Sequence, residues 1–276
     1  MHSSLLAVLA TALLLPAVPA TTITAAAPLT QDPAAEAPDL TTLYQGFCAD
    51  EDFDGLVALW QKNKTRVLGT IDRDLEGSLA LWESVQGGST EEVPLPDDAK
   101  AAIDALHARA LFGARAASAA FDRPIFLDYA SSFVGWSTKQ KRAFREGQAA
   151  FGRAVGGLRT DDHAAALEGG QQCFDLALPL GDWWGTAMGL GAKGRALLAM
   201  DRKEEALAAL SQARLLNHEL GLEQAEARNL TDMLDVLEDL EYWPRALAVC
   251  NDLMAMLGDA GSDMFGDRKK AIEAHL

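Results

Sequence analysis

The chain has 276 residues, and its 40 acidic residues outnumber its 24 lysines and arginines, so its formal net charge at pH 7 is −16. A surface of this charge repels nucleic acid and anionic lipid, which argues against both as partners. The three cysteines, Cys48, Cys173 and Cys250, include no CxxC pair and no cysteine–histidine cluster, so neither a zinc site nor a disulfide framework is indicated. We expect Cys173 and Cys250, which lie in apolar helical sequence, to be buried as small hydrophobic side chains.

The first 20 residues predict a secretory signal peptide. They contain no acid, lysine or arginine, and the apolar run Leu5–Leu15 is too short to span a bilayer comfortably. Pro16 and the small-residue sequence Val18-Pro19-Ala20 suit a cleavage site, with an uncut N-terminal membrane anchor as the alternative. Residues 21–39 are rich in Ala, Thr and Pro and are predicted to be a disordered linker. We therefore expect an exported protein, periplasmic or extracellular, with no membrane span in its mature chain.

Residues 40–136 predict an N-terminal helical region that contains a short self-similarity. Residues 52–60 and 74–82 both place acids before apolar residues at helical spacing, and each stretch ends in a tryptophan, Trp60 or Trp82. We interpret both as helices that begin at their acids and present the tryptophan to a core. A further helical stretch is expected between them, over Thr65–Asp74.

Two more helices are predicted before residue 137. A break at 87–98 contains two glycines and two prolines. An Ala-rich helix follows over about 99–120, with Asp97 and Asp98 at its N-terminus. The next helix is predicted to begin at Pro124 and to end at Gly135.

The stretch from residue 161 to residue 261 repeats at a spacing of 40 residues. Three acids, three Ala-Leu dipeptides and three glycines fall in register. They are Asp161, Asp201 and Glu241; Ala166-Leu167, Ala206-Leu207 and Ala246-Leu247; and Gly181, Gly221 and Gly261. We expect each unit to be a hairpin of two helices whose apolar faces are buried by stacking on the next unit.

The repeat domain is predicted to run from 137 to 276. Its first helix begins near Ser137 and carries Phe144, Phe151 and Val155. Later helices are predicted at about 163–178, 183–199, 202–219, 223–239 and 243–257, and a capping helix at 263–276. Such a cap covers the outer face of the last repeat. No stretch shows strand-like alternation, so the predicted fold class is all-α.

Small residues recur where the paired helices would cross. In the middle unit they are Gly194, Ala206 and Ala213, and residues 187–218 resemble one copy of the tetratricopeptide repeat. The equivalent positions hold Ala154, Ala166 and Cys173 in the preceding unit and Leu234, Ala246 and Leu253 in the following one. The resemblance covers about 138–261, with a unit of 40 residues rather than that family's 34. It implies an α–α superhelix, a right-handed solenoid whose first helices line a concave, peptide-binding face. The alternative is a plain helical bundle whose repeat is purely structural.

The resemblance also implies that four polar residues face this groove. They are Arg195, Arg228, Thr231 and Asp235. A solvated helix face would look the same. The function that we expect is a scaffold or adaptor that binds a protein or peptide on its concave face, without catalysis or a cofactor. One alternative is an enzyme, such as a hydrolase, with a site between the N-terminal helices and the solenoid near His107 or His163. Another is a self-assembling structural subunit.

Two further stretches carry residue types that can bind a ligand. Asp50–Gly55 resembles the opening of an EF-hand calcium loop, but the twelfth position is Gln61 rather than glutamate, and an acidic helix N-terminus is the favoured interpretation. Trp183 and Trp184 point about 100° apart on a helix, so one could be an exposed anchor for a partner. Packing against a neighbouring unit is favoured for both.

One segment of this acidic chain is locally basic. It consists of Lys139, Lys141, Arg142, Arg145, Arg153 and Arg159. It could receive an acidic partner or the chain's own acidic surface, and a solvated helix face is the favoured interpretation.

Overall fold

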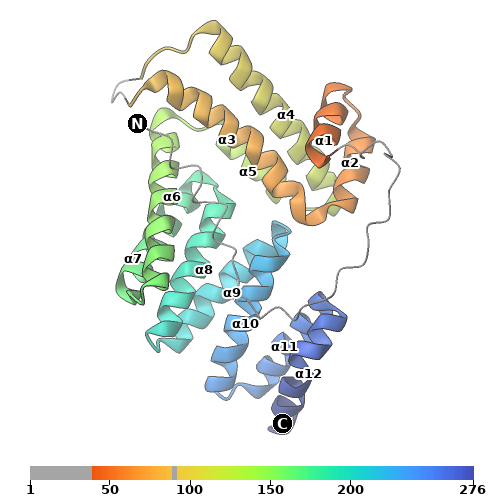
Figure 1. Cartoon of the computed structure of the whole chain (residues 1–276), viewed down its shortest axis with the longest axis vertical. Helices are drawn as coiled ribbons and strands as arrows, with labels where there is room; N and C mark the ends of the chain where they lie inside the picture. Colours follow the sequence, from red (N-terminus) through yellow and green to blue (C-terminus); the bar gives the residue numbers. More distant parts are fainter. Residues whose placement is uncertain (1–38, 89–91) are drawn as a thin grey trace, which may run out of the picture. The chain divides into compact units, whose positions relative to one another are not determined.

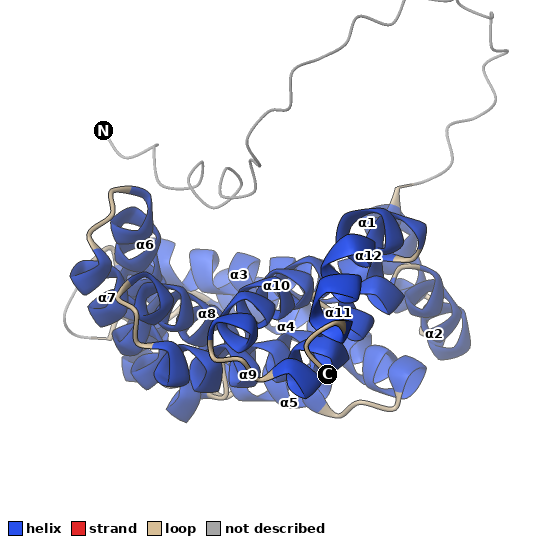
Figure 2. Ribbon diagram, turned by 90° about the horizontal axis from the view of Figure 1, so that it is seen from below, coloured by secondary structure: helices blue, strands red, loops and turns tan. Residues whose placement is uncertain are grey.

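A computed structural model describes residues 39–88 and 92–276, so the predicted signal peptide and all of the predicted linker except Asp39 lie outside the described residues. Described residues form twelve α-helices and no strand, which confirms the all-α fold class (Figure 1, Figure 2). The helices are α1 Leu40–Ala49, α2 Phe53–Lys62, α3 Val67–Gln86, α4 Asp97–Phe121, α5 Ile125–Val134, α6 Thr138–Arg159, α7 His163–Ala177, α8 Trp183–Ala199, α9 Lys203–Glu219, α10 Glu223–Asp239, α11 Trp243–Leu257 and α12 Asp259–Glu273. From α6 onward each helix packs against the next one in the chain, as in an α–α superhelix. None of these twelve helices combines the length and the apolar character that a membrane crossing requires.

The helix α2 begins, as predicted, at the acids of the first tryptophan-bearing stretch. The Asp52 carboxylate accepts a hydrogen bond of 2.9 Å from the Gly55 amide and so caps the helix. Trp60 is fully buried, and its indole Nε1 donates to the Gly113 carbonyl at 3.0 Å. The acidic stretch before α2 is therefore a helix N-terminus, the interpretation that the sequence favoured.

The second tryptophan-bearing stretch lies inside one long helix, α3, which corrects a prediction. Trp82 is buried as expected, but α3 begins at Val67, so no helix starts at Asp74. Asp74 is buried in the middle of α3. The Arg109 guanidinium of α4 donates two charge-assisted hydrogen bonds to its carboxylate, at 2.5 and 2.8 Å, which offset the loss of water. The sequence pattern gave a false helix start because this buried partner lies 35 residues away.

The next two helices lie close to their predicted bounds. α4 has Asp97 and Asp98 in its first turn, and α5 follows Pro124 and ends before Gly135. The aromatic side chains of α5 are buried in the hydrophobic core of the N-terminal helices.

The turns give the 40-residue spacing its structural basis. Asp161, Asp201 and Glu241 lie in the turn inside each hairpin with left-handed φ angles of 56°, 57° and 57°. Gly181 and Gly221 lie between hairpins with φ angles of 67° and 70°. Glycine adopts this conformation without a steric penalty.

The third glycine of the series does not close its unit, contrary to the prediction. Gly258, with a φ angle of 60°, lies between α11 and α12, whereas Gly261 is a buried residue within α12. A Cβ atom at residue 261 would lie 2.8 Å from the Met254 backbone, so glycine is needed there for the close approach of α12 to α11. The capping helix consequently begins at Asp259, before the predicted residue 263.

Small side chains let the repeat helices approach closely, as predicted. Ala166, Ala206 and Ala246 are fully buried, and a Cβ atom at Gly194 would lie 2.7 Å from Leu210 Cγ. The two helices within each hairpin therefore cross at equivalent positions.

Two glycines that the sequence analysis did not single out bring α7 and α8 even closer. A Cβ atom at Gly170 would lie 2.7 Å from the Lys193 amide nitrogen, and one at Gly189 would lie 2.7 Å from the Phe174 amide nitrogen. Since both of these neighbours are backbone atoms, α7 and α8 meet backbone to backbone.

The N-terminal helices pack against the turns between hairpins. Leu180 and Leu220, from two of these turns, belong to the same hydrophobic core as the N-terminal aromatic residues. Trp136, which links α5 to α6, donates from its indole nitrogen to the Leu180 carbonyl at 2.8 Å. Trp183 and Trp184 are both partly buried against this core, so both pack, as favoured, although the core belongs mainly to the N-terminal helices rather than to a neighbouring repeat unit.

Candidate functional site

The four residues predicted to line a groove lie on the first helices of two hairpins, with Arg195 on α8 and the other three on α10. Arg195 is half-buried, and its Nε donates to the Gly191 carbonyl of its own helix at 3.3 Å. Burial lowers the pKa of the Arg195 guanidinium, which still carries its charge because its ordinary pKa is so high. Arg228 is exposed. Across residues 39–88 and 92–276, neither guanidinium lies within ion-pair distance of a carboxylate.

The other two predicted residues bond within the protein. Thr231 is half-buried, and its hydroxyl donates to the Ala227 carbonyl one turn back at 2.9 Å. Asp235 is exposed, and its carboxylate accepts from the Arg268 guanidinium of α12 at 2.5 Å. Asp235 therefore helps to hold the capping helix.

The structure adds Asp232 to this group, a residue that the sequence analysis missed. Asp232 is half-buried on α10, and its Oδ2 has no hydrogen-bond partner among the described residues. Burial raises the pKa of Asp232 to about 6, and the nearby guanidinium groups of Arg195 and Arg228 act in the opposite direction. Arg228 and Asp232 are four residues apart on one helix, a spacing that brings side chains together. This four-residue spacing is the sequence pattern from which Asp232 could have been predicted to lie beside Arg228.

A buried side-chain amide on α10, that of Asn229, is also unsatisfied. Asn229 is only 4 % exposed, and its Nδ2 has no hydrogen-bond partner among the residues described. Buried polar atoms are nearly always hydrogen-bonded, to protein or to ordered water. We call the surface of α8 and α10 that carries Arg195, Arg228, Thr231, Asp232 and Asp235 the first-helix face.

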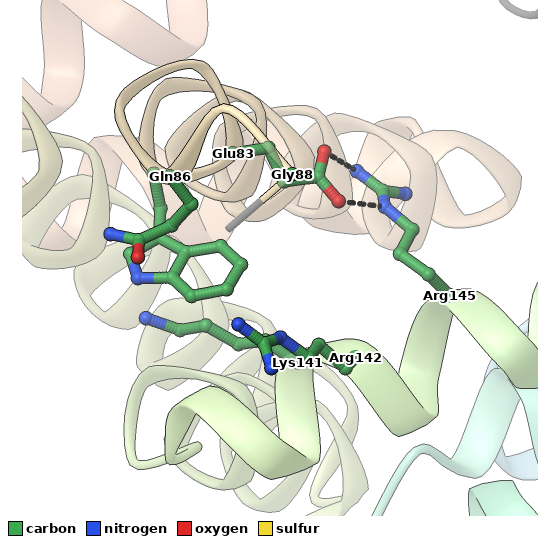
Figure 3. A pocket seen from close by; sticks show the side chains of 7 residues that line it. Glu83, Gln86, Gly88, Lys141, Arg142 and Arg145 are labelled. Carbon is green, nitrogen blue, oxygen red and sulfur yellow. Dashed lines mark hydrogen bonds and ion pairs between the residues drawn. The ribbon is translucent and has the colours of Figure 1, made fainter. Parts of the chain in front are cut away.

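A separate pocket of about 510 Å³ lies between the end of α3 and the start of α6 (Figure 3). Figure 3 shows Glu83 and Gln86 on one side and Lys141, Arg142 and Arg145 on the other. The Lys141 ammonium lies 5.0 Å from the centroid of the buried Trp82 ring, a cation–π contact. Burial lowers the pKa of Lys141.

Arg145 forms ion pairs with two glutamates of α3. Its guanidinium donates to both carboxylate oxygens of Glu83, at 2.7 and 2.9 Å, and to Glu76 at 2.8 Å. The favoured interpretation of the basic segment as a solvated helix face is thus wrong for Lys141 and Arg145, since both contact α3. The alternative that the segment receives the chain's own acidic surface is correct for Arg145.

Carboxyl groups gather where α3, α5 and α8 meet. The Tyr129 hydroxyl donates to Asp72 at 2.5 Å. Burial raises the pKa of Asp72 to about 7, and the carboxylates of Glu76 and Asp182 add to this rise. Asp182 itself is 5 % exposed and caps α8 by accepting from the Gly185 amide at 2.8 Å. Burial raises the pKa of Asp182 to about 6.

The histidines named for an enzymatic site lie in different places. His107 of α4 contacts the Ser78 hydroxyl of α3 through Nε2 at 2.9 Å. Ser78 is 2 % exposed and donates its single proton to the Leu75 carbonyl at 2.7 Å, so Nε2 of His107 is the donor in this contact. That polarity is the reverse of a serine nucleophile activated by a histidine base. His163 lies at the start of α7, and its Nδ1 is buried without a partner among the described residues.

The remaining candidate ligands are accounted for by packing. Cys173 and Cys250 are buried, as predicted, and Cys48 is half-buried; all three are free thiols. In the described part of the chain, no three His, Cys, Asp or Glu side chains are grouped in a way that could hold a metal ion.

Comparison with known proteins leaves the function to be argued from this geometry. No protein-family model matches the chain, and no curated protein matches it significantly.

Proposed function

We propose that this protein is an exported scaffold of the tetratricopeptide-repeat type that binds a peptide segment of a partner protein on its first-helix face. Binding would depend on shape and side-chain complementarity on a preformed surface, without catalysis and without a cofactor. The predicted signal peptide supports a site of action in the periplasm or outside the cell.

The observation that carries the proposal is the incomplete polar group of the first-helix face. Arg195 and Arg228 carry guanidinium groups that form no ion pair with any described carboxylate, although the chain has 16 more acids than bases. Beside them, one oxygen of Asp232 is buried without a partner. A bound peptide can satisfy such atoms with its own amide and carboxylate groups.

The chemistry of these groups indicates which peptides should bind. Guanidinium groups bind carboxylates through paired hydrogen bonds, so the ligand should carry an acidic side chain or a free C-terminal carboxylate. Asp232 can accept a hydrogen bond from a backbone amide of the same peptide. The resemblance of the repeats to the tetratricopeptide family supports a peptide rather than a small molecule as the ligand.

The test is a selection of displayed random peptides of about 12 residues against the immobilised chain from Thr21 onward, a format that suits short peptide ligands. We expect enriched sequences with a carboxylate at a fixed position. The double variant Arg195→Gln/Arg228→Gln should bind an enriched peptide at least about tenfold more weakly in fluorescence anisotropy. Asp235 is left unchanged because its loss would release Arg268 of the capping helix.

A matched control removes the same charge elsewhere. Arg202, which pairs with Glu205, and Arg245 of α11 lie outside the first-helix face. The double variant Arg202→Gln/Arg245→Gln should bind like the unchanged chain. Failure to enrich any peptide, or equal weakening in both double variants, would count against the proposed function.

A further inference from the structure

The N-terminal helices meet the repeat stack at the turn between the first and second hairpins. Trp136 is 5 % exposed, and its indole Nε1 donates to the Leu180 carbonyl of this turn at 2.8 Å. At Gly181, a Cβ atom would come within 2.9 Å of the Cβ of Ser132 on α5, so the turn lies directly against α5. We call this contact the α5–α8 joint. Its residues are Asp72, Tyr129, Ser132, Trp136, Leu180, Gly181 and Asp182.

Two carboxyl groups lie in this joint, one on each side of it. Asp72 of α3 accepts a hydrogen bond from the Tyr129 hydroxyl at 2.5 Å. Asp182, the N-cap of α8, is 5 % exposed and accepts from the Gly185 amide at 2.8 Å. Across residues 39–88 and 92–276, neither carboxyl forms an ion pair with a described residue. A buried carboxylate without a cation beside it is costly, so the protonated acid is favoured at both positions.

The charged groups of the surrounding helices do not remove this cost. Glu76, one turn along α3 from Asp72, carries a negative charge that raises the pKa of both Asp72 and Asp182. The Arg145 guanidinium of α6 acts in the opposite direction on Asp72. Arg145, however, donates its hydrogen bonds to Glu76 and Glu83, so its charge is already paired.

Two further titratable groups face the aspartates, and both stay neutral. Burial raises the pKa of the Tyr129 hydroxyl well above its ordinary value and that of the Cys173 thiol of α7 to about 12. Burial likewise raises the pKa of Asp72 to about 7 and that of Asp182 to about 6. Both aspartates therefore hold a proton at pH values where an exposed aspartate is ionised. Their ionisation would place like charges on both sides of the joint.

We propose that the α5–α8 joint is a pH-sensitive contact, which is closed while Asp72 and Asp182 are protonated and opens when both ionise. In the open joint, Trp136 no longer donates to Leu180, and both carboxylates reach water. The closed joint binds the two protons more tightly than the open joint does, so the open population should rise as the pH rises from about 4 to about 7.

This pH response is separate from the proposed peptide binding. Asp182 precedes Arg195 of the first-helix face by 13 residues on α8, which is about 20 Å along the helix. The α5–α8 joint can therefore open or stay closed whether or not a peptide binds to the first-helix face.

Hydrogen exchange of the tryptophan indoles, followed by NMR on the chain from Thr21 onward, tests the proposal. The Trp136 indole reports on the joint, and the Trp60 indole, which donates to the Gly113 carbonyl, reports on the N-terminal core. Exchange rates divided by the intrinsic rate at each pH give the open populations. Between pH 5 and pH 7.5, the open population at Trp136 should rise at least about tenfold. At pH 7.5 it should exceed the open population at Trp60, because the joint opens without unfolding the core.

Asparagine variants identify the groups responsible. Asn resembles the protonated acid and is an equally good N-cap, so Asp72→Asn/Asp182→Asn should keep the joint closed and remove the rise at Trp136. Asp182→Asn alone should remove part of it. The control Asp162→Asn changes the exposed N-cap of α7, which accepts from the Ala165 amide at 3.0 Å, and should leave the rise unchanged.

Three results would overturn the proposal. One is an open population at Trp136 that does not rise with pH in the unchanged chain. Another is a rise that persists in Asp72→Asn/Asp182→Asn. The third is equal open populations at Trp136 and Trp60 at every pH, which would show that the joint opens only when the whole chain unfolds.

Discussion

The N-terminal helices and the repeat helices achieve the same complete burial by opposite means. The largest fully buried side chains of α1–α5 include Trp60, Tyr44, Tyr129, Phe126 and Phe133. In the repeats, the crossing positions are occupied mainly by alanine and glycine, and α7 meets α8 backbone to backbone. The first region is therefore sensitive to the loss of a large side chain, and the second to the gain of a small one. In the repeats, the bare helix faces at Gly170 and Gly189 are where α7 and α8 contact each other most closely.

The largest effect should come from removing a large side chain of the N-terminal core. Trp60→Ala should lower the free energy of unfolding by about 4 kcal/mol, because it leaves a cavity and leaves the Gly113 carbonyl without its hydrogen-bond donor. Denaturant unfolding followed by circular dichroism measures this loss. Trp183→Ala should cost clearly less, since Trp183 is only partly buried. Equal losses of unfolding free energy would show that the extent of burial does not determine the cost of removing a tryptophan.

A somewhat smaller effect should follow from adding a side chain where α7 meets α8. Gly170→Val should lower the free energy of unfolding by about 3 kcal/mol, because its Cβ would press on the Lys193 backbone and force the helices apart. Gly152→Val is the matched control on α6, where a Cβ meets nothing, and it should be close to neutral. The comparison of the two regions would be wrong if both glycine variants unfolded with the same free energy.

The smallest effect concerns pH, at the contact between the two regions. The pKa of Asp72 is raised from 3.8 to about 7, so the folded chain holds this proton more tightly than the unfolded chain. The contribution of Asp72 to stability should therefore fall as the pH rises from about 4 to about 7 and should change no further above that range.

The variant Asp72→Asn isolates this contribution, because it keeps an acceptor for the Tyr129 hydroxyl but does not titrate. The difference in the free energy of unfolding between Asp72→Asn and the unchanged chain should grow by at least about 1 kcal/mol between pH 4 and pH 7. A difference that stays constant with pH would show that Asp72 does not hold its proton in the folded chain.

Local sequence patterns predicted most of the fold. The 40-residue spacing of Asp161, Asp201 and Glu241 located the hairpins, because the same left-handed turn recurs at each acid. The pattern misled where a distant partner decides the structure: Asp74 resembles a helix start, yet Arg109 of another helix buries it inside α3. Gly261 belongs to the repeat by spacing, but the close approach of α12 explains it.

The candidate site was less predictable for the same physical reason. Arg195 and Arg228 could be selected by their place on the first helices. Asp235, however, is occupied by an ion pair with Arg268 of the capping helix, and no local sequence pattern reveals that pair. Asp232 was missed because burial of a charged residue on an amphipathic helix follows only from the packing of two hairpins.

The most direct test of the central claim, that bare backbone contact joins α7 to α8, compares Gly189→Ala with Gly152→Ala by denaturant unfolding. At Gly189 the added Cβ would lie 2.7 Å from the Phe174 amide nitrogen, whereas at Gly152 it would meet nothing within 4 Å. We expect Gly189→Ala to lower the free energy of unfolding and Gly152→Ala to raise it by up to about 1 kcal/mol. Two variants that both gain stability would contradict the claim.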